Sequence, residues 1–88
     1  LAYRLEQFYK SGETGMSKIT VTEAVAKYDL TRREHTILKH LMSGMDNTDI
    51  CEELVITPNT LKKHILNIYR KLGIKNRVQL FKMVKEFE

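Results

Sequence analysis

Basic and amide side chains gather on one side of the segment 57–73, and their spacing suits a helix that binds a polyanion. The polar face comprises Asn59, Lys62, Lys63, Leu66, Asn67 and Arg70, with Lys71 at its edge. The opposite, apolar stripe comprises Leu61, Ile65, Ile68 and Leu72, whose spacings of 4, 3 and 4 keep one direction on a helix. Side chains of the polar face can neutralise phosphates and reach base edges, so the segment predicts contact with a nucleic acid.

The same segment has recognisable helix ends. Thr57 is a suitable N-cap, and Pro58 follows at a position where its missing amide hydrogen costs nothing. Gly73 can adopt the left-handed conformation that ends a helix. We therefore predict one helix over about residues 58–72, with its apolar stripe packed inward.

The charge of the chain is unevenly distributed. The formal net charge is +4, but residues 54–85 contain no Asp or Glu and have a charge of +8. The rest of the chain sums to −4, from 7 basic and 11 acidic residues. This asymmetry indicates a polyanionic partner for the basic part, and a merely solvated basic face is the alternative interpretation.

The composition argues against catalysis and against a metal site. A chain of 88 residues forms one small domain, so a large enclosed active site is not expected. The sequence contains no nucleophile with a plausible base and no glycine-rich phosphate loop. Cys51 alone cannot form an internal disulfide or a thiolate zinc site, and His35, His40 and His64 lack metal-ligand spacing. We expect no enzymatic activity, no cofactor and no metal.

The ends of the chain suggest a fragment. The first residue is Leu, so we expect a longer protein to precede it. No apolar run approaches the roughly 18 residues of a membrane helix, and no secretory signal is present. We expect a soluble, cytoplasmic location, with membrane attachment through an upstream segment left open.

Residues 1–19 are expected to be a linker or an N-terminal helical extension. Four apolar residues, Leu1, Leu5, Phe8 and Tyr9, share one side of a helix that is too short to be stable alone. Residues 11–15 have the composition of a linker. The domain proper is expected to span residues 20–88.

Helix-start signals divide residues 20–88 into successive helices. They are Thr20 or Thr22, the capping box of Thr31 and Glu34, the pair Asp46 and Asp49, Thr57, and the pair Asn76 and Gln79. We expect the first helix to end at Tyr28 and the last to run from about Arg77 to near Phe87. The short helix within residues 46–54, a tight turn and the long basic helix form a helix-turn-helix arrangement. In such an arrangement the second helix enters the major groove of DNA.

One longer pattern runs from Leu30 to about Val84 without a gap. It reads Leu30-Thr31-x-Arg33-Glu34, Gly44-x-x-Asn47, Ile50, Leu54, Thr60-x-Lys62-x-His64 and Asn67-Ile68-Tyr69-x-Lys71-Leu72-Gly73-Ile74-x-Asn76-Arg77-x-Gln79-Leu80. This pattern resembles the signature of LuxR-type (NarL/FixJ-like) DNA-binding domains. A match through about 50 residues is far more specific than a short motif. The resemblance says nothing about residues 1–19.

The resemblance implies an all-α fold, a small helical bundle that contains a helix-turn-helix and usually ends a transcriptional regulator. It implies sequence-specific binding of double-stranded DNA by a homodimer that forms through the last helix. It also implies a sensor or receiver domain upstream of the DNA-binding domain. It places Lys62, Lys63 and Leu66 toward the major groove, and Thr60, Lys62 and Asn47 near the DNA backbone. Leu66 is apolar where relatives are commonly polar, so its base contact would be to a thymine methyl group.

Two sets of site residues follow. The expected DNA contacts are Asn47, Thr57, Asn59, Thr60, Lys62, Lys63, Leu66, Asn67, Arg70 and Lys71. The expected dimer contacts are Val78, Phe81 and Lys82, on a different face of the last helix from Leu80, Met83, Val84 and Phe87, which suit the core. A wider core stripe is the alternative interpretation of Val78 and Phe81.

Other interpretations stay open at this point. His64 flanks the buried stripe, so a packed, neutral imidazole is favoured over a phosphate contact. Glu34 and Arg77 are expected to make a structural contact, and their pairing with each other is a hypothesis. A helical protein-interaction or dimerisation module with a basic face is the alternative function. RNA binding is disfavoured, because the A-form major groove is too narrow for a helix.

Overall fold

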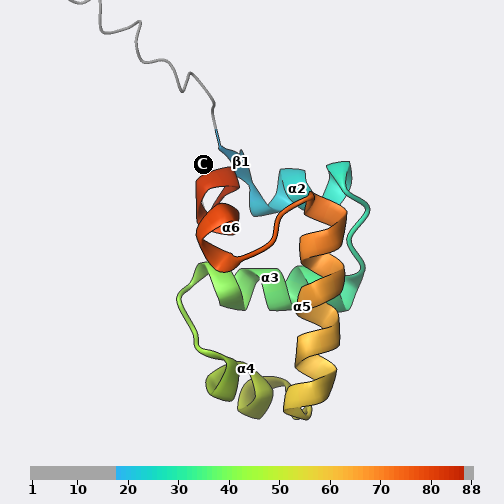
Figure 1. The fold of residues 1–88 in the computed structure, drawn as a ribbon, viewed down its shortest axis with the longest axis vertical. Coiled ribbons are helices and arrows are strands. Elements are labelled where there is room, and N and C mark those ends of the chain that lie inside the picture. Colours follow the sequence, from blue (N-terminus) through green and yellow to red (C-terminus); the bar gives the residue numbers. More distant parts are fainter. Residues whose placement is uncertain (1–17, 87–88) are drawn as a thin grey trace, which may run out of the picture.

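The computed structural model describes residues 18–86, which form five helices and two short strands (Figure 1). In chain order these are β1 (Ile19–Thr20), α2 (Val21–Lys27), α3 (Arg32–Met42), α4 (Asn47–Leu54), α5 (Pro58–Leu72), α6 (Arg77–Met83) and β2 (Val84–Lys85). The all-α fold predicted from the sequence is confirmed. The predicted helix over residues 1–10, the linker at residues 11–15 and the core role of Phe87 lie outside the described residues.

Each described helix begins at a side-chain cap that the sequence pattern had located. Complete capping boxes start α2 at Thr20 with Glu23 and α3 at Thr31 with Glu34. The later helices begin with single caps, in which Asp46, Thr57 and Asn76 accept from the backbone amides of Asp49, Thr60 and Gln79. These bonds satisfy amide hydrogens that have no partner within the helix, so the starts are set locally.

The long helix α5 packs its apolar stripe against the rest of the domain, with α3 crossing behind it and α4 at its first turns (Figure 1). Leu61, Ile68 and Leu72 are buried, and Ile65 is half-buried against the core. The core also contains Val21, Ala24, Leu30, Ile37, Leu38, Leu41, Ile50, Leu80 and Val84. Burial of these side chains fixes the rotation of α5 about its axis, which leaves its polar face outward.

The last helix is shorter than predicted. It ends at Met83, and Val84 and Lys85 form β2, which pairs in parallel with β1 through Ile19–Val84 and Thr20–Lys85. Val84 has extended backbone angles and is fully buried. Its side chain is therefore part of the core, as predicted, but it belongs to a strand and not to the last helix. The prediction of a helix to near Phe87 was wrong because helical spacing within one segment carries no information about a partner strand 65 residues earlier.

None of the helices between residues 18 and 86 is both long and apolar enough to cross a membrane. Within the same residues, no group of three or more His, Cys, Asp or Glu side chains is arranged to hold a metal ion. Cys51 is a free thiol, half-buried against the core.

Candidate nucleic-acid interface

Helices α4 and α5 and the turn between them form a helix-turn-helix unit, with α4 and the turn at one end of the domain (Figure 1). The turn is tight because Val55 adopts a left-handed conformation with φ 55°, and the amide of Ile56 donates to the carbonyl of Cys51 at 3.1 Å. Val55 has no packing role there, since its side chain is 88% exposed. A β-branched residue in this conformation is strained, and nothing in the sequence pattern had indicated it.

The outward face of α5 gathers most of the residues predicted to bind DNA. Its exposed members are Asn59, Lys62, Lys63, Leu66 and Arg70, while Thr60 and Asn67 are half-buried at its margins. Leu66 is 51% exposed, which leaves an apolar contact point between basic neighbours. Asn47 is exposed at the start of α4, and His64 is half-buried beside the core stripe. The helix thus presents a positive surface with one apolar point.

The first turn of α5 contains a pair of hydrogen-bonded hydroxyl groups. The hydroxyl of Thr57 accepts from the Thr60 amide at 3.2 Å and donates to the Thr60 hydroxyl at 3.0 Å. Because the Thr60 oxygen accepts this bond, its own hydroxyl hydrogen is not used in it and can donate to another group. The positive end of the helix dipole lies at the same place, so a phosphate is the chemical group that suits it.

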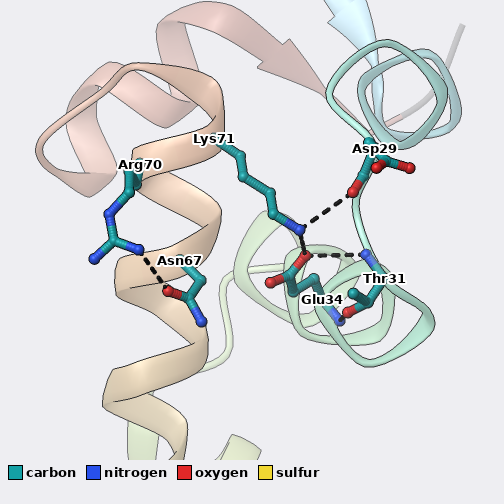
Figure 2. Close-up of polar contacts among 6 residues, drawn as sticks. All are labelled: Asp29, Thr31, Glu34, Asn67, Arg70 and Lys71. Atoms are coloured by element: carbon teal, nitrogen blue, oxygen red, sulfur yellow. Dashed lines mark hydrogen bonds and ion pairs between the residues drawn. The ribbon is translucent and has the colours of Figure 1, made fainter.

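The last two turns of α5 contain two basic residues that point in different directions (Figure 2). Arg70 folds back along the outward face, where its Nη1 donates to Oδ1 of Asn67 at 3.0 Å. Lys71 extends to the other side, and its Nζ lies 2.7 Å from Oε1 of Glu34 and 3.2 Å from the carbonyl oxygen of Asp29. The sequence pattern had placed Lys71 at the edge of the basic face, but its ammonium group is directed to α3 instead.

Glu34 is a buried carboxylate with partners for its charge. Its Oε1 accepts from the Thr31 amide at 2.9 Å and from Lys71, and the residue is 4% exposed. Burial raises the pKa of this carboxyl, but the hydrogen bonds from Lys71 and Thr31 and the charge of Lys71 outweigh burial, so the pKa lies below its ordinary value. The ionised pair therefore ties the C-terminal part of α5 to the start of α3.

Arg77 does not pair with Glu34, so that hypothesis was wrong. Its Nη2 donates to the carbonyl oxygens of Leu41 at 3.0 Å and Met45 at 2.6 Å, on the two sides of the turn after α3. Arg77 thus has a structural role in holding the chain just before α4. Its guanidinium also lies 5.7 Å from the ring centre of Phe81.

The residues predicted for a dimer contact form a small exposed surface on α6. Val78 is 63% exposed, Phe81 is 37% exposed, and Lys82 is also exposed. Leu80 and Met83 face the body instead, buried and half-buried respectively. The alternative interpretation of Val78 as part of a wider core stripe is therefore wrong.

The sequence also matches known proteins. The family described as bacterial regulatory proteins, luxR family, matches residues 28–84. The Fimbriae Z protein of Escherichia coli strain K12 is 36% identical over 81 residues, which cover 92% of this chain and 36% of that protein. The CsgBAC operon transcriptional regulatory protein of the same strain is 44% identical over 50 residues, covering 57% of this chain and 23% of that protein.

A third relative comes from another bacterium. The transcriptional regulatory protein LnrK of Bacillus subtilis strain 168 is 45% identical over 51 residues, which cover 58% of this chain and 23% of that protein. The chain thus spans only 23% to 36% of the lengths of these three relatives. The family match covers most of the chain and includes α3, α4, α5 and α6. The chain therefore belongs to the LuxR family of bacterial regulatory proteins and contains the helix-turn-helix DNA-binding domain of that family.

Proposed function

We propose that this domain binds duplex DNA in a sequence-specific manner by inserting α5, its recognition helix, into the major groove. The observation that supports this most directly is the outward face of α5, which exposes Lys62, Lys63 and Arg70 and contains no acidic residue. The major groove is about 12 Å wide and admits one helix. Since the apolar stripe of α5 is buried, the basic face is the one available to DNA.

The roles of individual residues follow from their places on α5. Thr60 and Lys62 lie in the first turns, where the free hydroxyl hydrogen and the ammonium group suit phosphates of the DNA backbone. Lys63 and Leu66 lie at the middle of the outward face and are proposed to meet base edges, Leu66 through a thymine methyl group. Asn47, Thr57 and Asn59 belong to the same interface near the start of the recognition helix. Lys71 is left out, because its ammonium group is paired with Glu34.

The domain is proposed to bind as a homodimer through α6. Two of the exposed large apolar residues of the described chain, Val78 and Phe81, lie together on this helix with Lys82 beside them. A two-fold contact there would place two recognition helices on half-sites separated by about one turn of DNA.

The domain is further proposed to be the output part of a larger cytoplasmic transcription regulator, with a sensor or receiver domain ahead of it. This rests on the greater length of the relatives, two of which are named as transcriptional regulatory proteins.

A gel-shift titration with mixed-sequence duplex at several salt concentrations tests the proposal. If about five basic residues meet phosphates, the logarithm of the affinity should fall with the logarithm of the salt concentration with a slope of about −5. A protein-interaction module, the alternative function, would show no such duplex binding. Double-stranded RNA of the same length is the matched control, because its major groove excludes α5.

A further inference from the structure

Asn67 and Arg70 form a hydrogen-bonded pair on the outward side of α5, one helical turn apart (Figure 2). Oδ1 of Asn67 accepts from Nη1 of Arg70 at 3.0 Å, and Arg70 is exposed while Asn67 is half-buried. We propose, on the basis of the proposed function, that Asn67 is a positioning residue which holds the Arg70 guanidinium against a DNA phosphate. Asn67 itself then reads no base.

The pair changes what the Asn67 side chain offers to DNA. An asparagine recognises adenine by using its amide oxygen as acceptor and its amide nitrogen as donor together. The oxygen of Asn67 is already engaged by Arg70. The outward location of Asn67 is therefore better explained by support of its neighbour than by adenine recognition.

The pair also prepares Arg70 for an anion. A guanidinium has five N–H donors in a rigid fork, and one of them is used by Asn67. The remaining donors are available to a ligand, and the side chain is held in one direction before binding. An arginine that is already ordered loses less conformational freedom when it binds, so its contact contributes more to affinity.

The place of Arg70 along α5 favours a phosphate over a base edge. At 1.5 Å per residue, Arg70 lies about 18 Å beyond Pro58 along the helix axis. A recognition helix contacts base edges mainly with its N-terminal residues, so Arg70, in the last turns of α5, is better placed for a phosphate. Lys71, at the next position, ties this end of α5 to Glu34, which fixes Arg70 relative to the domain.

The test compares the wild type with Asn67→Ala, Arg70→Ala and the double variant on mixed-sequence duplex over a range of salt concentrations. We expect Arg70→Ala to weaken binding about tenfold and to reduce the magnitude of the salt slope by about 1. We expect Asn67→Ala to weaken binding about threefold, equally for all sequences, and to add nothing when Arg70 is already Ala.

A second measurement locates the contact. Duplexes with a single neutral methylphosphonate unit at successive positions should show one position where neutralisation weakens the wild type but not Arg70→Ala. In Asn67→Ala, neutralisation at that position should weaken binding less than it does in the wild type. Lys39→Ala is the matched control, because it removes the same charge from an exposed position on α3 and should change the salt slope less. Thermal unfolding of each variant excludes a general loss of folding as the cause.

Three results would overturn the inference. They are unchanged binding by Asn67→Ala, effects of Asn67→Ala and Arg70→Ala that simply add, and an Asn67→Ala variant that changes base preference. If the wild type itself binds duplex without salt dependence, the proposed function fails as well, so the two failures are distinguishable.

Discussion

The ammonium group of Lys71 lies 2.7 Å from the carboxylate of Glu34, across 37 residues of sequence. This ion pair joins the C-terminal part of α5 to the start of α3, so the most basic helix of the domain uses one of its charges internally. The side chain of Lys71 is 35% exposed and that of Glu34 is 5% exposed. The two partners should therefore respond very differently to mutation.

Removing the lysine should cost more than removing the carboxylate charge. Lys71→Met leaves a buried carboxylate without its cation and should lower the free energy of unfolding by about 3 kcal/mol. Glu34→Gln leaves a lysine that can turn to solvent, so about 1 kcal/mol is expected. Chemical denaturation of both variants and of the double variant measures this. A double variant less stable than Lys71→Met alone would contradict the pairing.

The same pair predicts how stability changes with pH. The pKa of Glu34 is lowered in the folded state, so its contribution is fully present above the unfolded pKa of about 4.3 and is lost as the pH falls through the folded pKa. The stability difference between the wild type and Glu34→Gln should therefore be constant near pH 6 to 7 and shrink as the pH falls below about 4.3. A difference that grows at low pH would show that the carboxyl group is not stabilised as the anion.

Arg77 should act independently of Glu34. Arg77→Met leaves the carbonyl group of Met45 without its donor and removes one of the donors to the carbonyl group of Leu41, which should lower the free energy of unfolding by about 1–3 kcal/mol. Because the two residues have different partners, the effects of Arg77→Met and Glu34→Gln should add within about 0.5 kcal/mol. A large coupling energy in this double-mutant cycle would indicate that Arg77 and Glu34 interact with each other.

Val55 offers a site where a smaller residue should stabilise the domain. Its left-handed conformation suits glycine, and its side chain is 88% exposed, so Val55→Gly loses almost no packing. We expect the free energy of unfolding to rise by about 1 kcal/mol, with Val55→Ala as the control that keeps the Cβ atom and gains little. Equal stability of the glycine and alanine variants would mean that the turn is not strained.

Four variants should separate the roles of residues on α5. Thr60→Ala and Lys62→Ala should weaken binding to all duplexes, and Lys62→Ala should also reduce the salt slope by about 1. Lys63→Ala and Leu66→Ala should change preference among sequences by about 1–3 kcal/mol. Binding to a selected site and to random duplex measures both effects. Four indistinguishable profiles would remove the proposed division between backbone and base contacts.

Self-association through α6 predicts that substitutions on this helix affect duplexes with two half-sites more than duplexes with one. Phe81→Ala and Val78→Asp should reduce affinity for a duplex with two half-sites by about 10²-fold, since each copy then binds alone. Binding to a duplex with one half-site should be nearly unchanged, because neither residue lies on α5. An equal loss on both duplexes would point to damaged folding in place of a lost dimer contact.

The parts of the fold that depend on neighbouring residues could be predicted from the sequence. Thr31 and Thr57 set their helix starts by accepting from the backbone amides of Glu34 and Thr60, three residues later, and both starts were located correctly. The stripe of Leu61, Ile68 and Leu72 was also identified, because a helix repeats its direction within a few residues.

The features that the sequence did not reveal depend on distant partners. The direction of Lys71 is decided by a carboxylate 37 residues away, and the partners of Arg77 are backbone carbonyl groups, which every residue possesses. The strand at Val84 exists only because Ile19 lies beside it. The hydrogen bond between Asn67 and Arg70 is local, but their spacing in the sequence does not show that the two side chains bind each other in the free domain.

The parallel pairing of β1 with β2 fixes the position of the start of the described chain relative to the end of α6. Ile19, the first residue of β1, pairs with Val84, which directly follows α6. This junction lies at the opposite end of the domain from α4 (Figure 1). The proposed upstream domain would therefore connect next to the C-terminal end of α6, the helix that contains Val78, Phe81 and the proposed self-association surface, and away from α4.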